Sequence, residues 1–175
     1  MSAVQPFRWD GSAMVPIRPR AADRAYVIGQ EYILEIVEPR SGAQHRYYFA
    51  AVAEAWRNLP EALADEYADA ETLRKKALIR TGYRDERSIV CASKAEARRV
   101  AAFIEPMDRY AIVTVSEAVV RVYTARSQSV RAMGRAEFGE SVEKVLAFCA
   151  NLIGVSGGEL DRNAGEAAFA AKGNA

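Results

Sequence analysis

Alternating hydrophobic and polar positions predict that the chain begins with strands and turns. In residues 30–38, one side of an extended chain carries Tyr32, Leu34 and Ile36, and the other carries Glu31, Ile33, Glu35 and Val37. This is typical of a half-buried strand, and Pro39 ends it. Asp10-Gly11 lies between two short apolar segments and predicts a hairpin turn. The prolines among the first nineteen residues exclude a helix there. We therefore expect strands and turns over residues 7–38.

From residue 42 to about 82, the apolar residues recur at helical spacing instead. Ser41 precedes the first helix, and its hydroxyl can cap it. A short helix over 60–67 and a third helix over 71–81 follow, the last closed by Gly82. On the first helix, five residues share the stripe predicted to be buried: His45, Phe49, Val52, Ala53 and Trp56. On the third, the apolar residues predicted to be buried are Leu73, Ala77 and Leu78, and the basic ones left largely outside are Arg74, Lys75 and Lys76.

Strands and helices then follow one another irregularly, which argues against a doubly wound parallel fold. Ser93 and Glu96 form a capping box at the start of a helix, and Ser116-Glu117 is a tight turn between two strands. The predicted elements are strand 87–92, helix 93–104, strands 110–115 and 118–123, and helix 134–153. This order indicates an α+β fold with a mainly antiparallel sheet, a helical insertion and a long C-terminal helix. We expect a single domain over residues 1–154 and a flexible tail over 155–175, which is rich in glycine and small residues.

The composition narrows the classes of function. The chain of 175 residues carries 24 Lys and Arg against 23 Asp and Glu, a formal charge of +1. Such a balance argues against a strongly basic nucleic-acid module but allows a local basic patch. No apolar run is long enough for a signal peptide or a membrane span, so we expect a cytoplasmic protein that does not enter a membrane. Cys91 and Cys149 lack the spacing of metal ligands and are expected to be packed, reduced thiols.

Catalytic patterns are absent from the sequence. His45 is the only histidine, and its place on the apolar stripe favours a structural imidazole over a general base. The candidate metal-binding carboxylates are scattered singly, mostly at turns, and no glycine-rich phosphate loop occurs. We therefore predict a protein that is not an enzyme and has no catalytic residues, no metal and no cofactor.

Basic and hydroxyl residues gather in three patches near the ends of predicted elements. Guanidinium groups, hydroxyls and backbone amides bind phosphate without reading sequence, and tyrosine rings can stack on unpaired bases. The alternative for each patch alone is a solvated charged face. The predicted nucleic-acid contacts are Arg40, Gln44 and Arg46, then Arg74 and Lys75, then Arg126, Ser127, Ser129 and Arg131, with Tyr47 and Tyr48 as stacking surfaces.

A series of short motifs over about residues 13–153 resembles a family of uncharacterised phage and prophage proteins. These motifs are Met14-Val15-Pro16, Gly29-Gln30-Glu31, Arg40-Ser41, His45-Arg46, Phe49-Ala50, Leu73-Arg74-Lys75, Leu78-Ile79, Gly82-Tyr83, Ser127-Gln128-Ser129, Met133 and Glu137-Phe138. Two of the segments, the one from Arg40 to Ala50 and the serine pair before Glu137-Phe138, are also distantly similar to the NinB (Orf) recombination mediators of phage lambda. The sequence departs from NinB at His45, where NinB has an amide side chain, and in a longer spacing between the serine pair and Glu137.

The resemblance to NinB implies a function. NinB is a dimer that binds single-stranded DNA, contacts the single-strand-binding protein and helps to load a strand-exchange protein. By this resemblance we expect a non-enzymatic, homodimeric accessory protein of phage recombination or replication in the host cytoplasm. Its partners would be single-stranded DNA and the host single-strand-binding protein. The alternative is a phage-encoded adaptor that uses the same basic groups to bind a host protein, without nucleic acid.

Overall fold

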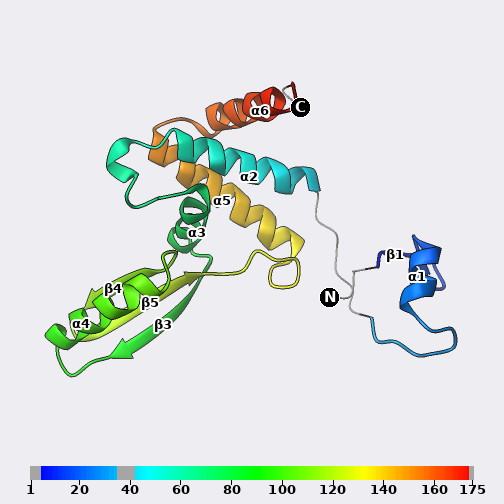
Figure 1. Cartoon of the computed structure of the whole chain (residues 1–175), viewed down its shortest axis with the longest axis horizontal. Coiled ribbons are helices and arrows are strands. Elements are labelled where there is room, and N and C mark those ends of the chain that lie inside the picture. Colours follow the sequence, from blue (N-terminus) through cyan, green and yellow to red (C-terminus); the bar gives the residue numbers. More distant parts are fainter. Residues whose placement is uncertain (1–4, 35–41, 174–175) are drawn as a thin grey trace. The chain divides into compact units, whose positions relative to one another are not determined.

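The chain forms two compact units, Met1–Ile36 and Val37–Ala175 (Figure 1). The computed structural model describes residues 5–34 of the first unit and 42–173 of the second. The single domain over 1–154 stays a prediction. In the first unit, the apolar side chains of the described residues are largely exposed. Among its described residues only Ala22 is buried.

The first unit is built on a small hairpin. Its strands β1 (Phe7–Trp9) and β2 (Met14–Pro16) are antiparallel. In the turn, the Asp10 carboxylate accepts hydrogen bonds from the backbone N–H groups of Ser12 at 2.8 Å and Ala13 at 2.9 Å. The predicted turn at Asp10-Gly11 is therefore confirmed.

Two other predictions for this unit are wrong. A short helix, α1 (Pro19–Ala25), begins at a proline, which is tolerated there because the first turn of a helix leaves its N–H groups unbonded anyway. Residues 30–34 form no strand, and Ile33 is 103% exposed. A strand needs a neighbour to bond with, and these five residues have none in the described part of the unit. The rest of the predicted strand, 35–38, lies outside the described residues.

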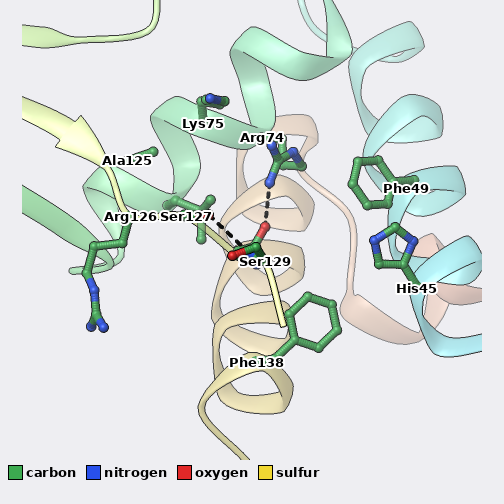
Figure 2. Close-up of a pocket in the computed structure, with 11 residues that line it drawn as sticks. His45, Phe49, Arg74, Lys75, Ala125, Arg126, Ser127, Ser129 and Phe138 are labelled. Atoms are coloured by element: carbon green, nitrogen blue, oxygen red, sulfur yellow. Dashed lines mark hydrogen bonds between the residues drawn. The ribbon is translucent and has the colours of Figure 1, made fainter. Parts of the chain in front are cut away.

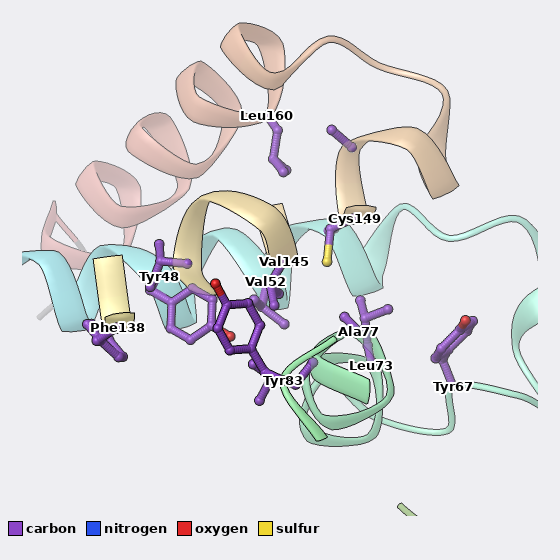
Figure 3. Close-up of a cluster of buried hydrophobic side chains, with 14 of the residues drawn as sticks. Tyr48, Val52, Tyr67, Leu73, Ala77, Tyr83, Phe138, Val145, Cys149 and Leu160 are labelled. Atoms are coloured by element: carbon purple, nitrogen blue, oxygen red, sulfur yellow. The ribbon is translucent and has the colours of Figure 1, made fainter. Parts of the chain in front are cut away.

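Helices make up the larger part of the second unit and enclose its main core (Figure 3). Buried side chains from four of them meet there, among them Tyr48, Leu73, Val145 and Leu160. The helical elements are α2 (Gly42–Arg57), a 3-10 turn η1 (Glu61–Leu63), α3 (Ala70–Arg80), α5 (Arg135–Ile153) and α6 (Gly157–Gly173). The predicted helices beginning at 42 and 71 and the long helix 134–153 are thus confirmed, whereas the predicted helix 60–67 is only a short 3-10 turn.

The face of α2 that is buried differs from the predicted one. Its buried residues are Tyr48, Ala51, Val52 and Ala55, so of the predicted stripe only Val52 is fully buried. His45 is exposed, and Phe49 and Trp56 are 40% and 36% exposed. The reason is that α2 packs against both α5 and α6, which cover the side of the helix that carries Tyr48.

The predicted flexible tail forms α6 instead. Leu160 and Ala164, one turn apart, are each 1% exposed, and the helix packs on α2. At its start, Ser156 and Glu159 cap each other: the Glu159 carboxylate accepts a hydrogen bond from the Ser156 N–H at 2.8 Å, and the Ser156 hydroxyl accepts one from the Glu159 N–H at 3.3 Å.

A three-stranded antiparallel sheet and one helix complete the second unit. The strands are β3 (Arg84–Val90), β4 (Ile112–Ser116) and β5 (Val119–Ala125), with β5 in the middle. Between β3 and β4 the chain forms α4 (Lys94–Ile104) and a 3-10 turn, η2 (Glu105–Met107), and α4 packs on the sheet through Ala97 and Ala101 against Val120. The predicted N-cap is confirmed, since the Ser93 hydroxyl accepts a hydrogen bond from the Glu96 N–H at 3.2 Å. The Glu96 carboxylate accepts in turn from the N–H of Ala92, one residue before the N-cap, at 2.7 Å. The predicted α+β fold with a mainly antiparallel sheet is therefore confirmed.

The connection from the sheet to α5 decides where the candidate site forms. As β5 ends, the Arg126 N–H donates to the Tyr83 carbonyl at 3.0 Å, which extends the pairing beyond the strand. The loop 126–134 then runs beside α3 to the start of α5. Met133, 1% exposed, anchors the end of this loop in the main core.

Candidate nucleic-acid interface

A pocket of about 370 Å³ opens where α2, α3, the end of β5 and the loop 126–134 come together (Figure 2). Segments far apart in the sequence contribute to it, so the pocket exists only in the folded chain. Its lining residues are His45, Phe49, Arg74, Lys75, Leu78, Ala125, Arg126, Ser127, Gln128, Ser129 and Phe138.

One side of the pocket is aromatic. His45 and Phe49 lie one turn apart on α2, with ring centroids 4.6 Å apart. The His45 ring is nearly parallel to that of Phe138, at 17° and 6.2 Å between centroids. Phe138 is buried, whereas Phe49 presents part of its ring to solvent. Figure 2 shows His45 and Phe49 on one side of the pocket and the segment Ala125–Ser127 on the other.

Arg74 lies at the edge of this aromatic side but is mostly buried, with 11% of its side chain exposed. Its guanidinium forms two hydrogen bonds with the Glu71 carboxylate, at 2.8 and 2.6 Å, and lies 5.2 Å from the centre of the Phe49 ring. Burial alone would lower the pKa of Arg74, but the bonds to Glu71 raise it above its ordinary value, and Arg74 in turn lowers the pKa of Glu71. The prediction that Arg74 lies largely outside is therefore wrong.

Gln128 connects Arg74 to the start of α5. Its amide oxygen accepts a short hydrogen bond from Arg74 Nη1, and its Nε2 donates to the Ser141 hydroxyl at 2.8 Å. Ser141 donates onward to the Phe138 carbonyl at 2.8 Å. The Tyr48 hydroxyl reaches the same amide oxygen at 3.4 Å, and burial raises the pKa of Tyr48 to about 12. This chain of polar groups fixes the loop to the helices and shapes the floor of the pocket.

The loop itself supplies hydroxyl groups. The Ser127 hydroxyl accepts a hydrogen bond from the Ser129 N–H at 3.2 Å, and the Ser129 hydroxyl accepts one from the Ala132 N–H at 3.2 Å. Because a hydroxyl can donate while it accepts, the O–H of the exposed Ser127 can still donate to a ligand oxygen. Arg126 pairs with Glu137 at 2.7 Å, and Figure 2 shows its side chain extending away from His45 and Phe49.

Lys75 is the cation best placed to meet a ligand charge. Its ammonium lies 4.9 Å from the centre of the Tyr110 ring, and in the described part of the chain it forms no ion pair. Arg74 and Arg126, by contrast, are each paired with a carboxylate. The pocket therefore carries a small excess of positive charge, centred on Lys75.

The structure gathers five of the predicted contact residues around the pocket and leaves the others out. The five are Arg74, Lys75, Arg126, Ser127 and Ser129. Gln44 and Arg46 are exposed on α2 and Arg131 on the loop, but none of them lines the pocket. Arg40 lies outside the described residues.

Both tyrosines predicted as stacking surfaces have structural partners. Tyr48 is 0% exposed, so a base cannot stack on it, and that prediction is wrong. Tyr47 is half-buried and donates a short hydrogen bond to the Asp161 carboxylate of α6. Burial and this carboxylate raise the pKa of Tyr47 to about 12.

Sequence reasoning missed the aromatic residues that do line the pocket. His45 and Phe49 were predicted to be buried because they share a helical stripe, and Phe138 was named only within a motif. The spacing of four between His45 and Phe49 was a usable signal of a shared face. This spacing does not show which other part of the chain the shared face meets.

No family model, curated protein or solved structure matches this chain. In the part that the structure describes, no helix is long and apolar enough to cross a bilayer. Nor do three or more His, Cys, Asp or Glu side chains of the described residues come together as metal ligands would. The chemistry of the pocket must therefore be inferred from its own side chains, and the resemblance to NinB stays a prediction.

Proposed function

We propose that the protein binds single-stranded DNA, with the strand passing over the pocket. The observation that supports this is the convergence of cationic, hydroxyl and aromatic side chains from α2, α3, the loop 126–134 and α5 on one cavity of about 370 Å³. These three kinds of side chain meet different parts of a nucleotide, since the first two bind phosphate and the third stacks on bases.

The phosphate contacts come from the side of the pocket formed by α3 and the loop. The Lys75 ammonium and the hydroxyls of Ser127 and Ser129 line this side, next to the Arg126–Glu137 pair. An ammonium that neutralises a phosphate releases cations condensed on the strand, which makes binding salt-dependent. With so few free charges, we expect a dissociation constant in roughly the micromolar range.

A single strand fits this surface better than a duplex. The bases of a duplex are stacked on one another, so the aromatic side of the pocket would gain nothing from them. The formal charge of +1 likewise differs from the strong positive charge of proteins that hold duplexes by backbone contacts alone.

The biological setting of this binding follows the resemblance to the phage family and to NinB. In this setting the protein is a non-enzymatic accessory factor of phage recombination or replication. It acts as a homodimer in the host cytoplasm and contacts the host single-strand-binding protein.

Fluorescence anisotropy with a labelled single-stranded oligonucleotide, titrated over a range of salt concentrations, tests the proposal. Replacing Lys75 by Ala should weaken binding and reduce the slope of log K against log salt by about 0.7, the value of one lost phosphate contact. Lys94→Ala is the matched control, because Lys94 is an exposed lysine on α4 that does not line the pocket.

Two results would contradict the proposal. The first is a wild-type protein that does not bind the oligonucleotide even at low salt, which would favour the adaptor alternative. The second is an equal loss of affinity for Lys75→Ala and Lys94→Ala, which would mean that the charge of the whole surface, and not this pocket, attracts the strand. A duplex of the same sequence should bind more weakly than the single strand.

A further inference from the structure

The aromatic side of the pocket has a property that phosphate binding does not use. Phe49 is an aromatic residue in a helix that already buries Tyr48 and Val52 on another face, yet its ring is 40% exposed. The ring lines the pocket, with the His45 ring beside it at 4.6 Å and the Arg74 guanidinium 5.2 Å from its centre. An apolar ring kept partly uncovered in a concave site is typical of a surface that a ligand completes.

We infer that the pocket takes up one unstacked base of the bound strand, so that the protein holds a whole nucleotide there and not only its phosphate. This inference rests on the proposed function. The base lies against Phe49 and His45, and its phosphate lies toward Lys75 and the hydroxyl of Ser127.

The size and the layout of the pocket agree with a single nucleotide. A volume of about 370 Å³ is at the small end of the range for ligand pockets, which begins at roughly 300 Å³. Figure 2 shows the aromatic residues His45 and Phe49 on one side of Arg74 and Ser129, and the segment Ala125–Ser127 on the other. A nucleotide has the same division, with a flat base at one end and a charged phosphate at the other.

The hydrogen bonds of the pocket floor indicate that the base is held by stacking and not read by its edge. The one side-chain amide in the pocket, Gln128, already accepts from Arg74 and donates to Ser141. Turning this amide toward the edge of a base would break these bonds, which also hold the loop in place. Because every base has a face that can stack, we expect the pocket to accept all four bases with similar affinity.

Two labelled oligonucleotides of equal length separate base capture from backbone binding. One carries normal bases, and in the other every nucleotide is replaced by an abasic tetrahydrofuran site, which leaves the phosphates unchanged. The wild-type protein should bind the normal oligonucleotide about tenfold or more tightly than the abasic one. Phe49→Leu, which keeps an apolar side chain but removes the aromatic face, should reduce this ratio severalfold while leaving the salt slope unchanged.

Phe103→Leu is the matched control, because Phe103 is a phenylalanine of α4 that is 69% exposed and does not line the pocket. It should behave as the wild type, and circular dichroism should show that all three proteins are folded alike.

If the wild type binds both oligonucleotides equally, the strand is held by its backbone alone; the inference then fails and the proposed function stands. A preference for bases that persists in Phe49→Leu would place the base elsewhere and would also overturn the inference. If neither oligonucleotide binds, the proposed function fails as well.

Discussion

Arg74 offers the sharpest test of the structure, because the sequence and the fold give it opposite roles. The sequence predicts an exposed phosphate contact, whereas the structure buries the guanidinium between Glu71, Gln128 and the ring of Phe49. The substitution Arg74→Met keeps most of the apolar stem and removes the charge and all five donors. It should therefore destabilise the fold more than it affects phosphate binding.

The loss in free energy of unfolding can be estimated from the contacts of the Arg74 guanidinium. Losing the charged donor to the Gln128 amide costs about 1.5–3 kcal/mol. Losing the contact with the Phe49 ring costs about 0.5–1 kcal/mol. The pair with Glu71 adds at most about 1 kcal/mol, since the Glu71 side chain is 39% exposed and can turn to water. The free energy of unfolding should fall by about 2–5 kcal/mol, which lowers the melting temperature of a unit of this size by about 5–15 °C.

Thermal denaturation followed by circular dichroism measures this effect, and urea denaturation gives the free energy independently. The neighbouring substitution Lys75→Met is the control, because Lys75 forms no ion pair within 4 Å in the described residues and its contact with the Tyr110 ring is worth about 0.5–1 kcal/mol. A variant Arg74→Met that melts within the error of Lys75→Met would refute the buried network. Arg74 would then be the solvent-facing cation that the sequence suggests.

Two further predictions concern the elements that frame the site. Replacing Leu160 by Ala should cost about 2–4 kcal/mol in urea denaturation, because α6 is docked through this buried side chain, whereas Glu166→Ala on the exposed side of α6 should change little. Asp69 caps α3, and the backbone N–H and hydroxyl of Thr72 hold the pKa of its carboxyl below the ordinary value of 3.8. Its stabilising contribution should be complete above pH 3.8 and be lost as the pH falls below it, so Asp69→Asn, which caps without titrating, should make the melting temperature less sensitive to acid; an unchanged acid dependence would contradict this.

Local signals in the sequence predicted those features that depend on a few neighbouring residues. The turn at Asp10-Gly11 and the N-cap at Ser93 form because a side chain satisfies backbone groups two or three positions away. Ser156 and Glu159 form a similar signal, inside the segment predicted to be a flexible tail. Two adjacent glycines lower helix propensity, yet the capping and the burial of Leu160 outweigh them.

The orientation of α2 shows why the buried face could not be predicted. From Tyr47 to Ala53 the helix consists entirely of apolar and aromatic residues, so its periodicity favours no single face. The helices that pack on α2 determine which face is buried, since α5 and α6 cover Tyr48 and leave Phe49 at the pocket. The prediction of a flexible tail over 155–175 omits α6, one of the two helices that cover Tyr48.

The charge of the pocket depends on ion pairs that form only in the folded chain. The sequence shows which cations exist but not which carboxylates fold against them: Arg74 is paired with Glu71 on the same helix, and Arg126 with Glu137 eleven positions on. Both pairs must be discounted before phosphate contacts are counted, which leaves Lys75 as the one cation of the pocket without a carboxylate partner in the described residues. Affinity for a strand must then depend more on stacking and hydroxyl contacts than the sequence suggests. The salt dependence of binding should accordingly correspond to one or two phosphate contacts, well short of the six cations counted from the predicted list, and a slope of four or more contacts would show that residues outside this pocket hold the strand.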